Sequence, residues 1–478
     1  MRRAATAPAA WLPARTSERL ERRIADALAH ARSTGRPTVA SVTVALAGAH
    51  DPSATVSASR RAGEDWFCLE QPDRDAIALA GLGVVRRLEA AGEGRFGQVA
   101  ERWRTLAADA AADEAGDAAP GAGLTCLGGF AFDAAGGEAP LWRGFAPASL
   151  VVPEISLARR GERTWLTVNV ELAPDDTAAD ALRRVRHRLG ELRAAPLPLL
   201  DPAPTGVYDV VSPMPPAHFE EAVARATARI ATGEFEKVVL AREVDVHAPR
   251  AHDAAAILGL LRVAFATSFV YAVGRGEATF IGATPELLIR RQGQRASTVA
   301  LAGSTRRSAD PAVDAHLGER LLRSDKDRHE NAIVARRIVR SLRPYSVWVT
   351  AAAEPVVIQV ANIQHLAAPI RAQLTAPIDA ITLAGHLHPT PAVGAEPATA
   401  TAAIPALEGF DRGWYAGALG WSDAGGDGEF CVALRCALLR DRLARCYAGC
   451  GVVRDSDPAA ELAESEVKLG VMLPVLAG

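Results

Sequence analysis

Carboxylates and lysines recur with helical spacing in two segments of the C-terminal half. Glu461, Glu464 and Lys468 are spaced at i, i+3 and i+7, so a helix places them on one face. In the segment SDKDRHEN, Lys326 and Glu330 are spaced at i and i+4. Either group alone is more often a solvated row of ion pairs. Carboxylates from two helices together, however, suit Mg²⁺, which takes few protein oxygens and completes its shell with water and an anionic substrate.

A lysine and a glutamate lie in segments that read as buried strands. Lys237 is part of FEKVVLAR, and Glu286 is part of FIGATPELLIRR. Burial lowers the pKa of a lysine, which can then act as a base, and raises the pKa of a carboxyl group, which can then donate a proton. The two residues are therefore a candidate acid–base pair, although their spacing does not show that they meet.

Glycine-containing segments and one arginine are candidates for binding carboxylates. The segments LAGS (301–304) and YAGCG (447–451) predict turns at strand ends, where bare backbone N–H groups can bind anions. Arg435, in CVALRCALL, could add a bidentate contact.

The composition is that of a folded protein with few lysines. The chain has 478 residues, with 53 basic and 56 acidic side chains and a net charge of −3. This excludes a mainly disordered chain and gives no reason to expect a nucleic-acid or membrane partner. Only Lys237, Lys326 and Lys468 are lysines. We interpret them as positions where a guanidinium cannot replace an ammonium, and the alternative is chance.

The cysteines and the N-terminus give no sign of secretion. Four of the six cysteines, Cys431, Cys436, Cys446 and Cys450, cluster without a C-x-x-C pair or a histidine, so we expect small apolar residues on strands and no zinc site. Prolines interrupt the N-terminal MRRAATAPAAWLPA, which does not resemble a signal peptide. No apolar run is long enough to span a membrane. We expect a cytoplasmic protein.

The first half of the sequence predicts a helix over 16–34, apolar strand-like segments near 37–47 and 54–70, and a hairpin around Arg160–Glu162. A proline-rich linker covers 194–216.

The second half predicts helices over 217–233 and 311–342, and a third helix capped by Asp457 with Pro458 in its first turn. The segments GWYAGALGW, GEFCVALRCALL and ARCYAGCGVV predict three successive antiparallel strands. Hairpin-joined strands with separate helices indicate an α+β architecture.

The order of these motifs resembles the chorismate-utilising enzymes, and most closely the isochorismate synthases. The resemblance is dense over residues 215–475 and weaker in the first half. It rests on the ordered series FEKVVLAR, FIGATPELL, LAGSTRR, SDKDRHEN, LHPTPAV, GWYAGALGW, EFCVALRCALL, CYAGCGVV and AELAESEVKLG.

The resemblance implies a role for each matched residue. Lys237 would be the base that activates water for attack at C2 of chorismate, and Glu286 the acid that protonates the departing C4 hydroxyl. Glu330 and Glu464 would bind Mg²⁺, with Glu461 close by through water. The residues implied to contact or line the substrate site are Gly303, Ser304, His329, Ala392, Arg435, Gly449 and Lys468.

The resemblance also implies the fold and the partners. Two antiparallel sheets would pack face to face as a large β-sandwich surrounded by helices, as in the anthranilate-synthase fold. Residues 1–205 would form the N-terminal half and residues 206–478 the chorismate-binding catalytic region of one structural domain. We expect a monomer without a glutaminase subunit, whose product enters menaquinone or siderophore biosynthesis.

Single positions bear on which relative the chain resembles. Ala392 stands where pyruvate-eliminating relatives usually carry threonine, which disfavours the alternative of a salicylate synthase. Lys237 and Glu286 are both present, which disfavours a non-catalytic chorismate-binding protein, and Lys237 also argues against ammonia-using relatives. Ala395 stands where glycine is usual, and Glu396 adds a charge.

Overall fold

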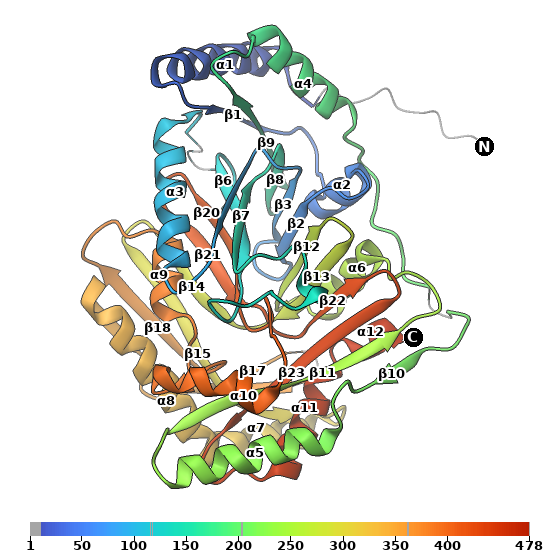
Figure 1. Ribbon diagram of the computed structural model, residues 1–478, viewed down its shortest axis with the longest axis vertical. Helices are drawn as coiled ribbons and strands as arrows, with labels where there is room; N and C mark the ends of the chain where they lie inside the picture. The colour runs from blue at the N-terminus through green and yellow to red at the C-terminus, as the bar shows by residue number, and fades with distance from the viewer. Residues whose placement is uncertain (1–10, 115, 117, 202–203, 361–362, 478) are drawn as a thin grey trace.

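Two large β-sheets packed face to face form the centre of the protein, and helices surround them (Figure 1). The computed structural model describes residues 11–114, 116, 118–201, 204–360 and 363–477. The fold is α+β, as predicted, and all strand pairs are antiparallel in the described part except β1 with β5. The first ten residues, where the sequence argues against a signal peptide, lie outside the described residues.

The first sheet has thirteen strands in the described part of the chain. Their order is β10 (Asp209–Val211), β11 (Lys237–His247), β23 (Leu443–Val452), β22 (Cys436–Arg440), β13 (Ala278–Thr284), β12 (Phe269–Arg275), β2 (Trp66–Gln71), β3 (Ile77–Leu82), β8 (Ile155–Arg160), β9 (Arg163–Leu172), β1 (Thr38–Ala45) and β5 (Ala111–Ala112), with β19 (Ala395–Glu396) paired to β11.

The second sheet has ten strands among the described residues. Their order is β16 (Ser346–Ala351), β18 (Ile363–Leu374), β15 (Arg295–Arg306), β14 (Leu287–Gln292), β21 (Gly428–Val432), β20 (Ala418–Asp423), β6 (Thr125–Phe130), β7 (Ala148–Val152) and β4 (Arg86–Ala90), with β17 (Val356–Gln359) paired to β18.

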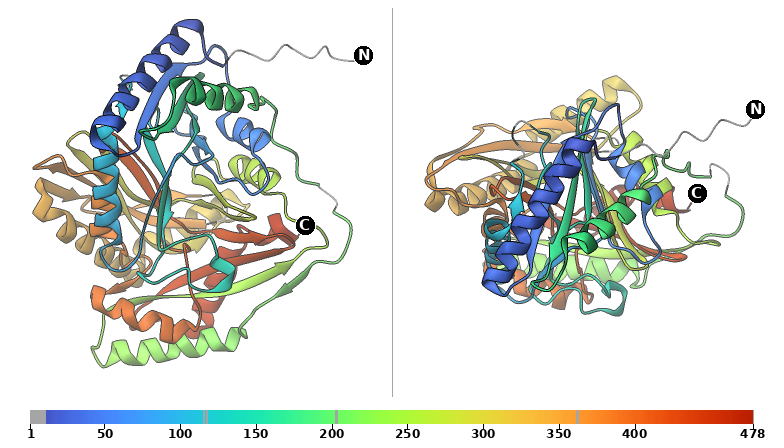
Figure 2. Two further views of the ribbon diagram at one scale, coloured as in Figure 1. Left: turned by 45° about the horizontal axis from the view of Figure 1, so that its top comes forward. Right: turned by 90° about the horizontal axis from the view of Figure 1, so that it is seen from above.

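Helices cover the ends and outer faces of the two sheets (Figure 2). The α-helices are α1 (Ala14–Thr34), α2 (Pro52–Ser59), α3 (Arg95–Asp109), α4 (Ala178–Gly190), α5 (Pro216–Ala231), α6 (Ala254–Ala264), α7 (Pro311–Arg323), α8 (Asp325–Leu342), α9 (Ala380–Leu387), α10 (Ile404–Glu408), α11 (Pro458–Leu469) and α12 (Leu473–Ala477). Helix α8 packs on β15 and β18, whereas α11 packs on β23 and against α5. Helix α8, which packs on the second sheet, and helix α11, which packs on the first, meet where Lys326 of α8 pairs with Glu461 of α11.

The main core lies between the sheets. Phe130 and Phe430 of the second sheet and Tyr271, Phe280 and Tyr447 of the first belong to one buried cluster. A second cluster lies on the outer face of the first sheet, beneath α1 and α6. Burial on both faces explains why strands such as β12 and β13 are buried at every position.

Both sheets combine strands from the two halves of the sequence. Strand β2 of the N-terminal half pairs with β12, and β6 pairs with β20. The linker predicted at 194–216 connects two sequence regions whose strands share the same sheets.

Two predicted elements differ from the observed ones. The helical pattern at 311–342 is broken at Ser324, not at Gly318, because the Ser324 hydroxyl accepts from the Asp327 N–H and so begins α8. The segment 54–70 contains the end of α2, capped by Asp51, before β2.

The chain also crosses between the sheets where the sequence predicted continuous structure. GEFCVALRCALL forms β21 in the second sheet and β22 in the first, and not one strand. The glycine segments 301–304 and 447–451 lie inside β15 and β23 and are not turns.

The prediction that the clustered cysteines are buried residues on strands is confirmed. All six cysteines are buried, unpaired and placed on strands. In the described part of the chain, no helix combines the length and apolar character needed to cross a membrane.

Candidate active site

The site lies where the chain crosses from one sheet to the other. Glu286 occupies the crossing from β13 to β14, and Arg435 occupies the crossing from β21 to β22. Their backbones bond to neighbouring crossing segments, since Val432 N–H donates to Glu286 O at 2.9 Å and Ala283 N–H donates to Arg435 O at 3.1 Å. Arg435 has a φ of +49°, a left-handed conformation that turns the chain without glycine. Both crossings thus place a charged side chain between the sheets.

A pocket between the sheets brings most of the predicted residues together. Nine of the twelve residues implied by the resemblance line it, and these are Glu286, Gly303, Ser304, Glu330, Ala392, Arg435, Gly449, Glu464 and Lys468. Lys237, Glu461 and His329 are not among the lining residues. Lys237 forms an ion pair with the lining residue Glu330, and a carboxylate oxygen of Glu461 lies within 4.8 Å of one of Glu464.

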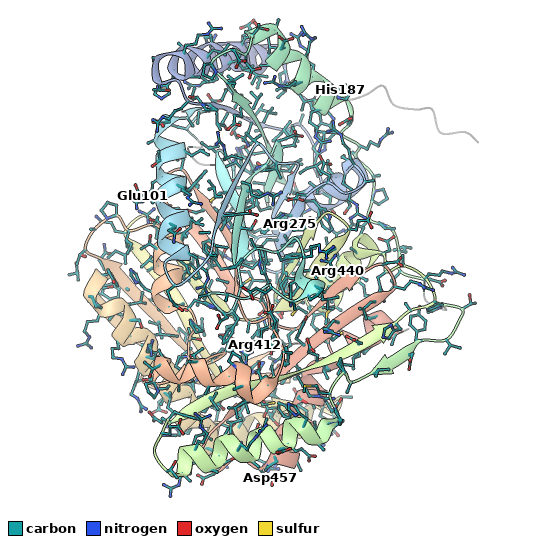
Figure 3. The ribbon with its side chains drawn as sticks, in the orientation of Figure 1. Glu101, His187, Arg275, Arg412, Arg440 and Asp457 are labelled. Carbon is teal, nitrogen blue, oxygen red and sulfur yellow. The ribbon has the colours of Figure 1, made fainter. Side chains whose placement is uncertain are left out.

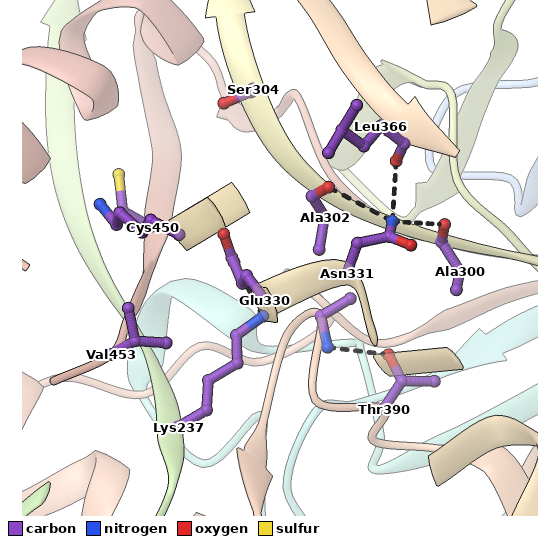
Figure 4. Close-up of polar contacts among 12 residues, drawn as sticks. Lys237, Ala300, Ala302, Ser304, Glu330, Asn331, Leu366, Thr390, Cys450 and Val453 are labelled. Carbon is purple, nitrogen blue, oxygen red and sulfur yellow. Dashed lines mark hydrogen bonds and ion pairs between the residues drawn. The ribbon is translucent and has the colours of Figure 1, made fainter. Parts of the chain in front are cut away.

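Lys237 is completely buried at the start of β11, and its ammonium forms an ion pair with Glu330 of α8 (Figure 4). The Nζ–Oε1 distance is 2.8 Å. Gly451 of β23 provides the space for this pair, because a Cβ at that position would lie 2.1 Å from Glu330 Oε1 and 2.9 Å from Lys237 Cε. Sequence reasoning missed Gly451, although it ends the YAGCG segment.

The three lysines of the chain all pair with carboxylates that the resemblance assigns to a metal site. The pairs and their N–O distances are Lys237–Glu330 at 2.8 Å, Lys326–Glu461 at 2.8 Å and Lys468–Glu464 at 2.6 Å. Lys326 therefore does not pair with Glu330, the partner that their i, i+4 spacing would offer. Helix α11 brings Glu461 to Lys326, while Lys237 occupies the partner position at Glu330.

Glu464 lies at the centre of a network that joins three elements. Its Oε1 accepts from Ser304 Oγ of β15 at 2.8 Å and pairs with Lys468, whose Nζ also donates to Gly449 O at 2.8 Å. Burial alone would raise the pKa of Glu464, but Lys468 and Ser304 together lower it to about 2. Glu464 is therefore ionised at neutral pH.

Glu461 and Glu464 are adjacent buried carboxylates. Burial and the charge of Glu464 raise the pKa of Glu461, while Lys326 and Ser456 act in the opposite direction. One ligand atom from each glutamate and the Cys450 sulfur lie within 4.8 Å of one another. Burial raises the pKa of the Cys450 thiol, so the sulfur stays protonated. Two hard carboxylates beside a neutral thiol fit a cation such as Mg²⁺ better than a thiolate-binding metal.

Asp327 is a further acidic residue of this region that the sequence reasoning missed. A Cβ at Gly303 would lie 2.8 Å from Asp327 Cβ, so the glycine, with a φ of +78°, permits α8 to approach β15. Burial and the nearby Glu330 and Glu464 raise the pKa of Asp327. Its place in SDKDRHEN, one turn before Glu330, could have identified it.

Asn331 anchors α8 next to Glu330. Its Nδ2 donates to three carbonyl oxygens, those of Ala300 at 3.1 Å, Ala302 at 3.3 Å and Leu366 at 3.0 Å (Figure 4). The side chain is buried, so these bonds have no competition from water. Asn331 therefore fixes the position of α8 relative to β15 and β18, and so the position of Glu330 relative to Lys237.

Glu286 is a buried carboxyl group among cations. Burial raises its pKa to about 7, although Lys237, Arg435 and Lys468 favour the ionised form. A carboxyl group with this pKa is partly protonated at neutral pH and can donate a proton.

Arg435 and His365 form a second polar contact in the pocket. The Nη2 atom of Arg435 lies 3.3 Å from Nε2 of His365. Burial and the charges of Arg435 and Lys468 lower the pKa of His365 to about 3, so the imidazole is neutral. Arg435 thus keeps its charge available for an anionic ligand.

His329 does not line the pocket. It directly precedes Glu330 on α8. Its side chain is 56% exposed, however, and its Nε2 lies 3.7 Å from Oε1 of Glu236, which is also exposed. Adjacent helical residues point about 100° apart, so a neighbour of an inward-facing glutamate faces elsewhere.

Ala392 lies in the loop between α9 and β19, and its backbone N–H donates to Thr390 Oγ1 at 3.3 Å. Ala395 and Glu396, the two residues that depart from the usual sequence after this loop, have clear structural roles. Ala395 and Glu396 form β19, paired with β11, and the Glu396 carboxylate forms ion pairs with Arg337 and Arg340 of α8.

The pocket is also lined by residues that the sequence did not single out individually, although Leu301, Ala302, Tyr447, Ala448 and Gly451 belong to the predicted LAGS and YAGCG segments. They are Val239, Pro285, Leu301, Ala302, His365, Val393, Arg412, Tyr415, Ala416, Leu434, Tyr447, Ala448 and Gly451. Many are apolar and give no chemical signal of their own in the sequence.

Comparisons with known proteins agree with this geometry. The sequence model of the family described as chorismate binding enzyme matches residues 26–477. The salicylate biosynthesis isochorismate synthase of Pseudomonas aeruginosa is 37% identical over 415 residues, which cover 85% of this chain and 84% of that protein. Isochorismate synthase EntC of Escherichia coli is 41% identical over 259 residues, 54% of this chain and 66% of that protein. The solved structure of MenF, the menaquinone-specific isochorismate synthase from Escherichia coli, superimposes with a TM-score of 0.77 at 26% identity over 95% of this chain and all of that one.

Proposed function

The chain belongs to the chorismate-binding enzyme family, and we propose that it is an isochorismate synthase that converts chorismate into isochorismate. The observation that carries this proposal is one pocket whose lining combines Glu286, a buried carboxyl group of raised pKa, with the cations Arg435 and Lys468, and whose lining residue Glu330 pairs with the buried Lys237. The cationic wall of Arg435 and Lys468 suits a substrate with two carboxylates.

The two candidate acid–base groups act on opposite ends of one allylic rearrangement. Lys237 acts in this step as the neutral amine, which requires its ion pair with Glu330 to open, and it takes a proton from a water molecule as the water oxygen bonds to C2 of the ring. The ring double bonds shift, and Glu286 gives its proton to the C4 hydroxyl, which leaves as water. The reaction consumes one water and releases one, so it needs no oxidant or reductant. In the reverse direction the two residues exchange roles.

The carboxylates of Glu330, Glu464 and Glu461 are the residues that would hold Mg²⁺. When bound, the ion would balance the negative charge of the substrate's ring carboxylate. The three lysines that pair with these glutamates keep the buried carboxylates compensated in the free protein.

Ala392 favours isochorismate as the final product. Its side chain is a methyl group that lines the pocket and offers no hydroxyl to a departing enolpyruvyl group. The isochorismate then serves menaquinone or siderophore biosynthesis. We further propose that the enzyme acts in the cytoplasm as a monomer, without a glutaminase subunit.

The test is to incubate the purified protein with chorismate and Mg²⁺ and to separate the products by liquid chromatography. Isochorismate is expected as the product, with the same final ratio of chorismate to isochorismate from either starting compound. Salicylate and pyruvate as the main products would identify a salicylate synthase instead. Binding of chorismate without turnover would identify a non-catalytic binding protein.

A further inference from the structure

Strand β11, which carries Lys237, has a gap along one of its edges. One edge pairs with β23 from Val238 to His247. On the other edge, β19 pairs with Lys237 and Val238, and β10 pairs only with the residues from Asp245 to His247. No strand covers the edge between these two points in the described part of the chain.

A buried ion pair replaces the missing strand. Glu408 of α10 and Arg412 are 1% and 3% exposed and bind each other. Arg412 Nη2 donates to Val239 O at 2.9 Å, and Ala241 N–H donates to Glu408 Oε1 at 2.6 Å. Together with the bond from Val239 N–H to Gly394 O at 2.8 Å, the pair supplies partners for three backbone groups of this edge, which are Val239 N–H, Val239 C=O and Ala241 N–H.

Arg412 also holds the opposite wall of the pocket. Its Nη1 donates to Val393 O at 2.8 Å, next to Ala392, and its guanidinium lies 4.2 Å from the ring centre of Phe132. Figure 3 labels Arg412 and shows its place in the lower half of the molecule. One planar guanidinium therefore binds the strand of Lys237, the loop of Ala392 and Glu408 at once. A lysine could not reproduce this geometry.

We propose that Arg412 and Glu408 are positioning residues that fix the distance between β11 and the loop around Ala392, and so place Lys237 for its reaction with chorismate. The inference rests on the proposed function. Arg435 and Lys468, which would bind the substrate's carboxylates, come from other elements. Displacement of β11 would therefore affect the chemical step more than substrate binding.

The test compares steady-state kinetics of Arg412→Lys and Glu408→Gln with the parent enzyme, at a temperature below the unfolding midpoint of each variant. For Arg412→Lys we expect kcat to fall about 10- to 100-fold and KM to change less than about threefold, because a small misplacement of a reacting group costs rate rather than binding. Glu408→Gln keeps the acceptor for Ala241 N–H and should lose less. The double variant Glu408→Leu/Arg412→Met removes both charges, which buried pairs often tolerate, and should fold with the kinetic defect of Arg412→Lys.

Arg188→Lys is the matched control. Arg188 of α4 is also buried and pairs with Glu64 and Glu191, but it lies in the N-terminal half, away from the pocket. This variant should have a lower unfolding midpoint with unchanged kcat. Unchanged kcat in folded Arg412→Lys or in the double variant would overturn the inference, and so would a rise in KM alone, which would make Arg412 a substrate ligand. Absence of turnover in the parent would refute the proposed function instead.

Discussion

At the scale of single residues, the site depends on paired charges in a buried environment. Each of the three lysines has a glutamate partner within 2.8 Å, although the chain uses arginine almost everywhere else. A compact ammonium fits beside a carboxylate in a narrow space where a planar guanidinium does not. The low lysine count thus marks the site in the sequence.

Glu286 should control the pH dependence of the reaction. Its raised pKa, about 7, means that the protonated acid needed for the forward reaction is lost as the pH rises through that value. The profile of kcat/KM should therefore descend above pH of about 7. Glu286→Gln should lower kcat about 10²- to 10⁴-fold and remove this descending limb. An unchanged limb in the variant would assign the titration to another group.

Gly451→Ala should separate Lys237 from Glu330, because the new methyl group would occupy the position of the Glu330 carboxylate. We expect kcat to fall by about 10-fold or more, since the base is displaced, while circular dichroism shows an intact fold. Gly97→Ala in α3, where a Cβ meets no atom within 4 Å, is the control and should retain full activity. Equal activity of both variants would show that the Lys237–Glu330 pair has no role in turnover.

At the scale of elements, the sequence predicted the helices that carry carboxylates but not the crossings between the sheets. The local sequence identified α11, with its N-cap at Asp457 and Pro458 in its first turn. GEFCVALRCALL contains no breaker, because Arg435 makes the turn at positive φ without glycine. The change of sheet is determined by packing against distant parts of the chain, which the local pattern of apolar and polar residues does not reveal. For the same reason the pairing of Lys326 with Glu461 of α11 could not be predicted from helical spacing.

Helix α8 should depend on Asn331 for its position. Asn331→Asp keeps the shape but removes the amide donor, so three buried carbonyl groups lose a partner and a carboxylate replaces an amide. We expect a loss of about 2–4 kcal/mol in the free energy of unfolding, together with a lower kcat because Glu330 shifts. Chemical denaturation and steady-state kinetics measure the two effects. Arg323→Ala at the exposed end of α7 is the control, and a stability of Asn331→Asp equal to that of the control would contradict the anchoring role.

At the scale of the whole molecule, the N-terminal half contributes strands to both sheets. The resemblance implied one β-sandwich, and the fold comparison agrees with it. The sequence did not show which strands of the first half pair with which strands of the second, because such pairs are distant along the chain. The pairs β2–β12 and β6–β20 place the catalytic crossings in the middle of the sheets and not at their edges.

A fragment of residues 206–478 should therefore not fold on its own. The fragment lacks β2 and β6, so the edges of β12 and β20 and one side of the main core would be exposed. We expect weak near-ultraviolet circular dichroism, no cooperative thermal transition and no turnover of chorismate. Recovery of activity on mixing with residues 11–205 would support the shared sheets, whereas an active, cooperatively unfolding fragment would contradict them.

The central claim is that Lys237 activates water that enters the product. The most direct measurement is a brief incubation of the enzyme with chorismate and Mg²⁺ in ¹⁸O-labelled water, with mass spectrometry of the isochorismate. The account predicts one labelled oxygen at C2 in the product of the parent enzyme, and no product from a folded Lys237→Ala variant. Unlabelled isochorismate, or labelled isochorismate formed by Lys237→Ala at the parent's rate, would contradict it.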